Sequence, residues 1–215
     1  MIKFSKCIPF ALMLATLVGC NVGIKGSGVS KTESRNVADF KSVSSEAVGD
    51  VNVTIGDSQS VEVTIDDNLL PLLVTEVVDG VLKVKTTGSF STSIGLKVNV
   101  TTPSLDSIHS SGVGNIKIEG LDSEQLAVEL SGVGGVTAKG KVQNLDVTVS
   151  GVGSANLREL LAENVSVTVS GVGGAEVYAS KSVNASTSGV GSIKVFGNPA
   201  EKKENKSGIG SIKFE

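Results

Sequence analysis

The tetrapeptide Ser-Gly-Val-Gly stands at residues 111–114 and recurs at 131–134, 150–153, 170–173 and 188–191, with Ser-Gly-Ile-Gly at 207–210. Successive copies lie 20, 19, 20, 18 and 19 residues apart. Apolar residues alternate with polar ones on both sides of each copy, as Leu126, Val128 and Leu130 do before Ser131. A period of two residues indicates a β-strand that buries one face. Each repeat therefore predicts a strand, a Ser-Gly-Val-Gly corner, a second strand and a polar return such as "KGKVQN".

A repeat of this length cannot bury its apolar face alone, so neighbouring repeats must stack. Equivalent strands would then pair in parallel about 4.8 Å apart. We therefore predict an all-β, single-domain parallel β-solenoid, or β-helix, with coils of about 19 residues and a less regular N-terminal part. An antiparallel meander with glycine-rich turns is the alternative, but it gives no reason for the constant period.

The glycines of the motifs are predicted to form the corners of the coils. Glycine permits a positive φ and lets two backbones approach where a side chain would collide. The structural positions are Gly112, Gly114, Gly132, Gly134, Gly151, Gly153, Gly171, Gly173, Gly189, Gly191, Gly208 and Gly210.

The central residue of each motif has two open orientations. If strand alternation continues through the corner, the glycines point inward and the central residues form an exposed ladder. Its members would be Val113, Val133, Val152, Val172, Val190 and Ile209. An apolar stripe of this kind is a candidate interaction surface. If a glycine in the left-handed region breaks the alternation, the same residues enter the core instead.

The two ends of the repeat region differ from its middle. The strand before Ser207 reads "EKKENK", which puts Lys202, Glu204 and Lys206 at inward positions. We predict that this strand is displaced outward or looped, and that its charges discourage end-to-end polymerisation. In residues 37–105 we expect wider coils of the same solenoid, a helical turn in "DDNLLPLL" and a hairpin that turns at Asp79-Gly80.

Composition limits the function classes. The 215 residues carry a net charge of −3 and no long run of Lys or Arg. Nucleic-acid binding needs clustered cations to neutralise phosphates, so we expect no nucleic-acid partner.

The first twenty residues, "MIKFSKCIPFALMLATLVGC", have the form of a targeting segment. Lys3 and Lys6 precede an apolar stretch from Cys7 to Val18, which is too short for a membrane span. The end, "LVGC", resembles a bacterial lipobox. That resemblance implies cleavage before Cys20, lipidation of Cys20 and, because Asn21 follows, an outer-membrane lipoprotein that faces the periplasm or the cell surface.

We accordingly divide the chain into three parts. Residues 1–19 are the predicted signal peptide, residues 20–36 a lipid-anchored flexible tether and residues 37–215 the β-solenoid. The mature domain would then hold no free thiol and no disulfide, since Cys7 and Cys20 are the only cysteines.

The region from residue 35 to 215 resembles a known family. The stretch from Phe40 to Val53, the Asp67–Asn68–Leu69 step, the Asp79-Gly80 turn and the repeated corners look like the head GIN domain of auto-transporter adhesins. The resemblance implies a secreted, often lipid-anchored β-solenoid. It carries over no functional residues.

The sequence contains little catalytic chemistry. His109 is the one histidine, and a solvated position at a strand end accounts for it. We expect no catalytic residue, no cofactor and no metal, because no ligand spacing and no regular Asp ladder is present. The leading hypothesis is a non-enzymatic envelope lipoprotein that presents the solenoid for binding or adhesion. Its candidate partners are the membrane, through the anchor, a glycan, an envelope protein or a second copy. The alternatives are a glycan-active β-helix enzyme and a structural protein that self-associates laterally.

Overall fold

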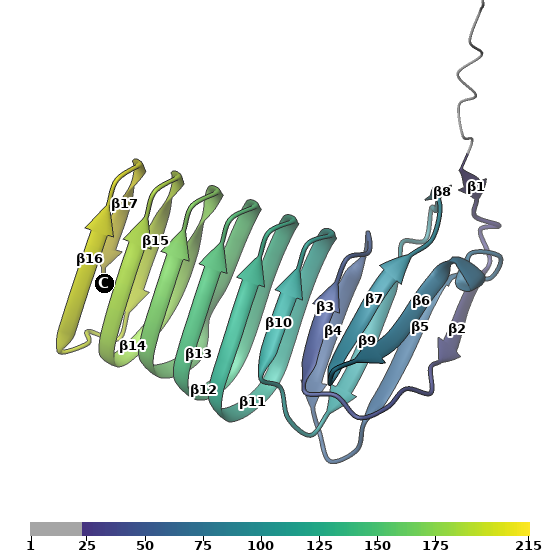
Figure 1. Cartoon of the computed structure of the whole chain (residues 1–215), viewed down its shortest axis with the longest axis horizontal. Helices are drawn as coiled ribbons and strands as arrows, with labels where there is room; N and C mark the ends of the chain where they lie inside the picture. The colour runs from purple at the N-terminus through teal and green to yellow at the C-terminus, as the bar shows by residue number, and fades with distance from the viewer. Residues whose placement is uncertain (1–22) are drawn as a thin grey trace, which may run out of the picture.

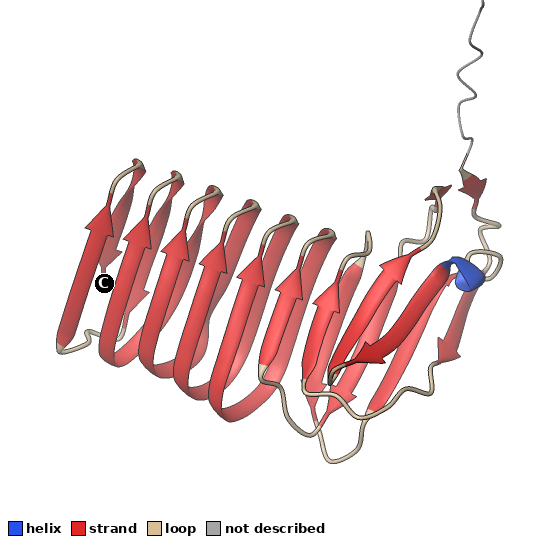
Figure 2. Cartoon of the chain, viewed as in Figure 1, coloured by secondary structure: helices blue, strands red, loops and turns tan. Residues whose placement is uncertain are grey.

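The computed structural model describes residues 23–215, which are almost entirely β-structure (Figures 1 and 2). One 3-10 helix, η1 (Leu70–Leu72), lies among the described strands. The N-terminal strands are β1 (Ile24–Lys25), β2 (Ser30–Ser34), β3 (Ser42–Ser45), β4 (Asp50–Ile55), β5 (Ser60–Asp66), β6 (Leu73–Val78), β7 (Val81–Thr86), β8 (Phe90–Ser91) and β9 (Lys97–Thr102). The repeat strands are β10 (Ser107–Ser110), β11 (Val113–Leu130), β12 (Val133–Val149), β13 (Val152–Val169), β14 (Val172–Thr187), β15 (Val190–Phe196), β16 (Glu201–Lys206) and β17 (Ile209–Phe214).

The repeats stack as the sequence predicts, in a parallel β-solenoid. Strand β11 pairs in parallel with β12, β12 with β13 and β13 with β14. Equivalent motif residues lie opposite one another, so that Val133 pairs with Val152 and Val152 with Val172. Figure 1 shows the coils side by side along one axis.

The polar returns differ from the prediction. In place of a separate polar return, each long strand stays hydrogen-bonded to its neighbours while it bends from one face of the solenoid to the other. The β11–β12 register shifts between Ile118 and Leu121, at the bend. Val142, within the stretch expected to be a polar return, is buried. An inward apolar residue at the bend therefore lets the strand continue around it.

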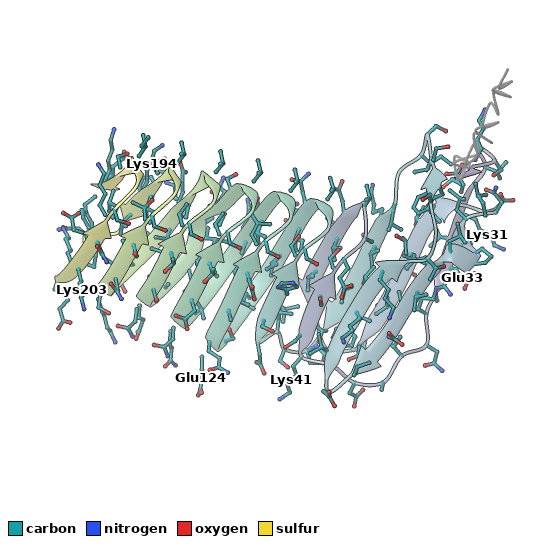
Figure 3. All side chains as sticks on the ribbon, turned by 45° about the horizontal axis from the view of Figure 1, so that its top comes forward. Lys31, Glu33, Lys41, Glu124, Lys194 and Lys203 are labelled. Carbon is teal, nitrogen blue, oxygen red and sulfur yellow. The ribbon has the colours of Figure 1, made fainter. Side chains whose placement is uncertain are left out.

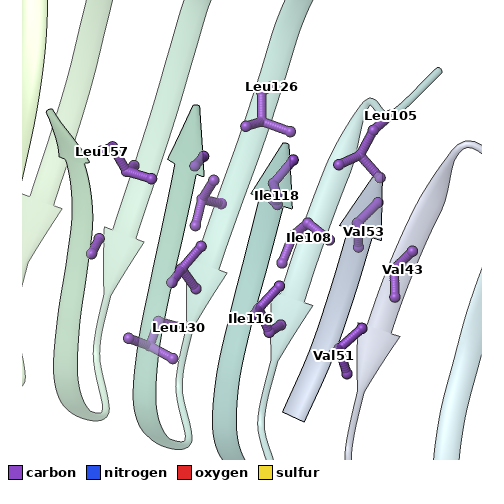
Figure 4. Packing of buried hydrophobic residues seen from close by; sticks show 14 of the residues in the cluster. Val43, Val51, Val53, Leu105, Ile108, Ile116, Ile118, Leu126, Leu130 and Leu157 are labelled. Atoms are coloured by element: carbon purple, nitrogen blue, oxygen red, sulfur yellow. The ribbon is translucent and has the colours of Figure 1, made fainter. Parts of the chain in front are cut away.

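One apolar core runs through the stack. Inward positions of both faces fill it, as Ile116 and Ile118 do from one face and Leu126 and Leu130 from the other (Figure 4). Each coil adds the same set of buried positions, so the core extends by one layer per repeat. This periodic burial is the reason that a strict residue alternation is kept over six motifs.

The corner glycines are required mainly by close backbone contact between coils. A Cβ on Gly132 would overlap the carbonyl oxygen of Gly112, and a Cβ on Gly153 would overlap that of Gly134. Gly134 also has a φ of 138°, which favours glycine. All twelve predicted corner glycines would place a Cβ closer than 3.0 Å to the backbone of the preceding coil.

Residues 37–105 continue the same sheet, but only some of them form wider coils. Strands β3 and β4 pair in parallel with repeat strands, and β7 and β9 extend those ladders. In contrast, β5 pairs antiparallel with β9, and β6 antiparallel with β7. The hairpin turn at Asp79-Gly80 is confirmed, with φ values of 53° and 74°. The helical turn expected in "DDNLLPLL" is η1.

The prediction of a flexible tether up to residue 36 is wrong for its described part. Strand β2 pairs antiparallel with β5, and β1 pairs in parallel with β8. Between them, Ser27 donates its backbone N–H to Asn68 Oδ1 at 2.9 Å and its hydroxyl to Asp67 Oδ1 at 2.5 Å. The Gly28 N–H donates to the buried Asp66 carboxylate at 2.7 Å. These polar contacts fix the segment against the solenoid.

The charged strand at the C-terminal end is regular, contrary to the prediction of a displaced or looped segment. Strand β16 pairs with β14 in unbroken register, from Ser182–Glu201 to Thr187–Lys206. No coil follows β16, and every residue of this strand is exposed. Charged side chains are therefore tolerated even at its inward positions. The Lys202 ammonium lies 5.1 Å from the centre of the Phe214 ring and donates to Asn198 Oδ1 at 3.0 Å. Long charged side chains therefore cover the open end of the core.

Candidate functional site: a valine ridge along one edge

The central residues of the motifs form a continuous exposed ladder. Val113, Val133, Val152, Val172 and Val190 are 46–54% exposed, and Ile209 is 80% exposed. Strand alternation continues through each corner, so the glycines on either side face the preceding coil while the valine faces solvent. Of the two orientations left open by the sequence, the outward one is therefore present.

The ladder has one further member that the sequence analysis missed. Val48 forms a parallel bridge with Val113 and is 59% exposed. The segment from Ser45 to Gly49 replaces a Ser-Gly-Val-Gly corner, with an extra residue and Ala47 in a glycine position. The similarity between "AVGDVNV" and "GVGNIKI" is the signal that could have revealed it. We call the seven residues the valine ridge: Val48, Val113, Val133, Val152, Val172, Val190 and Ile209.

The borders of the valine ridge carry small, uncharged residues. On one side lies a ladder of motif serines, such as Ser150 and Ser170, which are exposed. On the other side, the position after each motif holds Asn115, Gly135, Ser154, Gly174, Ser192 or Ser211. None of the six five-residue segments that begin at a motif serine contains a charged side chain, although 19% of the chain is charged. The edge is therefore apolar at its crest and neutral at its sides.

A second surface, on the strands that lead into the corners, is polar. Asn164 donates to Asn144 Oδ1 at 3.1 Å, and Ser182 donates to Asn164 Oδ1 at 2.9 Å. These residues line a shallow groove of about 800 Å³ together with Asp146, Asn184 and the β16 residues. The amide and hydroxyl groups along this groove therefore bond largely to one another.

In residues 23–215 the ionisable side chains are spread along the solenoid (Figure 3), and several of them form pairs between neighbouring coils. Lys194 donates to Glu176 at 2.9 Å, and this carboxylate raises the pKa of the lysine. Glu159 likewise raises the pKa of Lys139, at 2.9 Å. His109 Nδ1 lies 3.2 Å from Glu129. Pairs of this kind at a solvated surface contribute little to stability, as expected of a solubilising face.

Further features concern anchoring and metals. Cys20 and the predicted signal peptide lie outside the described residues. In residues 23–215, no group of three or more His, Cys, Asp or Glu side chains is placed to hold a metal ion. The described part of the chain contains no helix long and apolar enough to cross a membrane.

Comparison with solved structures finds the same architecture. A crystal structure of a "putative adhesin" from Bacteroides fragilis NCTC 9343 is 28% identical, with a TM-score of 0.78; the match covers 90% of this chain and 100% of that chain. A "putative adhesin" from Parabacteroides merdae ATCC 43184 is 20% identical, with a TM-score of 0.58 and coverage of 90% and 99%. A "putative lipid binding protein" from Parabacteroides distasonis ATCC 8503 is 20% identical, with a TM-score of 0.52 and coverage of 89% and 99%. The last two likenesses concern the fold alone.

The family comparison covers most of the chain. A search of curated proteins finds no match to this chain. Residues 39–199 match the family model described as "putative auto-transporter adhesin, head GIN domain". The match spans the Phe40 region, the Asp79-Gly80 hairpin and the first five corner motifs, which are the features on which the resemblance in the sequence rests. The chain belongs to the head GIN domain family of auto-transporter adhesins.

Proposed function

We propose that this protein is a non-enzymatic cell-envelope lipoprotein that presents a rigid β-solenoid for binding, in keeping with an adhesive role. The valine ridge is its contact surface. The observation that carries the proposal is the persistence of an exposed apolar residue at the same corner in seven successive coils, at a position that the fold leaves in solvent.

The physical basis is the contrast between the valine ridge and the rest of the surface. Covering water-exposed valines with a partner favours binding by about 25 cal/mol for each Å² of apolar surface removed from water. The faces on either side carry paired charges and hydrogen-bonded amides, which would lose solvation on contact. Family membership and the adhesin neighbours support binding in place of catalysis.

A double substitution on the valine ridge tests the proposal. Val152→Asp with Val172→Asp should leave the melting temperature almost unchanged, because substitutions of exposed residues usually alter stability by about 0.5 kcal/mol or less. The same protein should lose binding in a screen against glycans, envelope proteins and lipid vesicles, or lose self-association measured by light scattering. The screen uses full-length protein purified from membranes.

The matched control moves the two charges inside the coil. Val147 and Val167 are neighbouring valines of the same two coils and are 2% and 0% exposed. Val147→Asp with Val167→Asp should unfold the domain, because two unpaired carboxylates would enter the core. A folded ridge variant that keeps the wild-type interactions would contradict the assignment of the valine ridge as the contact surface.

The proposed anchor has its own test. Cys20→Ser removes the thiol that would carry the lipid, so the variant should accumulate as uncleaved precursor and leave the outer-membrane fraction. Metabolic labelling with a fatty acid should mark the wild type and not the variant. A mature-size Cys20→Ser protein that still fractionates with the outer membrane would show that the anchor lies elsewhere.

A further inference from the structure

The N-terminal end of the described chain is fixed at the same edge as the valine ridge. The Ile24 N–H donates to Ser89 O at 2.9 Å and the Gly26 N–H to Ser91 O at 2.8 Å. The polar contacts of Ser27 and Gly28 with Asp66, Asp67 and Asn68 hold the next residues. Figures 1 and 2 show β1 and β8 projecting at the N-terminal end of the edge formed by the corner loops.

The valine ridge continues into this N-terminal tip. Asp50 pairs with Lys97, and a Cβ on Gly49 would meet Leu96, so the two chains run side by side as they approach Val48 on one and Gly95 on the other. Ile94 is 39% exposed, and Ile24 is 49% exposed. The loop from Thr87 to Gly95, "TGSFSTSIG", contains no charged residue. Apolar and hydroxyl side chains therefore extend from the last coil to the first strand.

The length of chain outside the described residues then limits where a lipid can lie. Cys20 lies three positions before Gly23, and an extended chain covers at most about 3.6 Å per position, or about 11 Å in total. A lipid on Cys20 would consequently enter the bilayer within this distance of β1. The N-terminal tip, and with it the first end of the valine ridge, would therefore lie close to the membrane.

We propose that the partner of the valine ridge is the lipid surface in which the protein is anchored, so that the solenoid lies along the membrane on its corner edge. This inference rests on the lipid anchor of the proposed function. Apolar side chains of interfacial elements reach roughly 5–10 Å into the boundary between headgroups and acyl chains. Flanking serines suit the hydrated headgroups, and Lys25 in β1 suits anionic lipids.

The dimensions of the valine ridge favour a bilayer over a protein partner. Six steps of about 4.8 Å make it about 29 Å long, and it is one side chain wide. A specific protein interface usually buries about 800 Å² on each partner, which needs a broader patch. Lys25 carries a charge at the N-terminal tip, and Glu46 and Asp50 carry charges at the first corner, where Asp50 accepts a hydrogen bond from the Asn115 N–H at 2.9 Å. The other six corners are neutral.

Two serines of one coil provide a matched test. Ser170 belongs to the corner edge, whereas Ser166 lies four residues earlier on the polar face, and both are exposed. Each is replaced by cysteine in the lipidated full-length chain and labelled with an environment-sensitive fluorophore. The proteins are reconstituted into vesicles of phosphatidylethanolamine and phosphatidylglycerol that contain a lipid-attached quencher.

The label at position 170 should shift its emission to the blue and lose intensity to the quencher, and the label at 166 should do neither. Adding Val152→Asp and Val172→Asp to Ser170→Cys should abolish the shift while the protein still sediments with vesicles through its lipid. Equal water exposure of both labels in vesicle-bound protein would overturn the inference and leave the anchor standing. A wild-type chain that fails to sediment with vesicles would overturn the anchor and the inference together. Loss of binding to a soluble protein or glycan in the ridge variant, without lipid contact at 170, would assign the edge to that ligand instead.

Discussion

Gly153→Ala should lower the free energy of unfolding by about 3 kcal/mol, since overpacking a close-packed position costs 1–3 kcal/mol or more. The methyl group would overlap the carbonyl oxygen of Gly134 in the preceding coil, and backbone cannot rotate away as a side chain can. Coils on both sides of β13 hold it in place through continuous parallel ladders. Denaturant unfolding followed by circular dichroism measures the loss.

A second glycine separates the effect of steric overlap from the general effect of replacing glycine. Gly135 lies one position after a corner, where a Cβ would be 3.2 Å from Ser154 O. Gly135→Ala should change stability by about 1 kcal/mol or less, because the lower entropy of the unfolded chain offsets a small displacement.

The position of the overlap along the stack should also matter. A Cβ on Gly210 would meet the Gly191 carbonyl oxygen as severely, but no coil follows β17, so the last coil can move outward. Gly210→Ala should cost about 1 kcal/mol, at the low end of the overpacking range. Equal losses at Gly153 and Gly210 would show that restraint by the following coil does not contribute.

The repeat region could be predicted from sequence because its determinants are local and periodic. Alternation around Leu145, Val147 and Val149 marks the inward face, and the fixed spacing of the motifs leaves stacking as the solution that buries every repeat. The orientation of Val152 could not be predicted, because the two glycines beside it permit either continuation or reversal of the alternation. The close approach of both glycines to the preceding coil in the structure shows that the alternation continues and that Val152 faces solvent.

The N-terminal part was harder to predict for a different reason. A half-buried strand has the same alternation in a parallel and in an antiparallel pair, so the antiparallel pairing of β5 leaves no mark in its sequence. The contacts of Ser27 with Asp67 and Asn68 join residues 40 and 41 positions apart. Polar contacts over such separations have no periodic pattern, and a Gly- and Ser-containing segment therefore resembles a tether.

The charged cap on the last coil should keep the solenoid from associating through its end. Lys202→Val, Glu204→Val and Lys206→Val together would place three valines at the inward positions next to Val183, Ala185 and Thr187. The open end would then be apolar on both strands, since Ile212 and Phe214 of β17 already pack against the core. Each valine covered by a partner contributes about 1.5–3 kcal/mol, so we expect dimers and larger assemblies in size-exclusion chromatography with light scattering.

The outward residues of the same strand provide the matched control. Glu201→Val, Lys203→Val and Asn205→Val also introduce three valines into β16, but at positions that pair with the outward residues of β14. If stacking through the core drives the association, the inward set should assemble at concentrations where the outward set remains as wild type. If both sets associate alike, general stickiness of the surface is the cause and the cap has no specific role. An edge strand such as β16 presents backbone groups that another chain could pair with. Association driven by stacking would mean that the inward charges of β16, and not its outward ones, prevent this pairing.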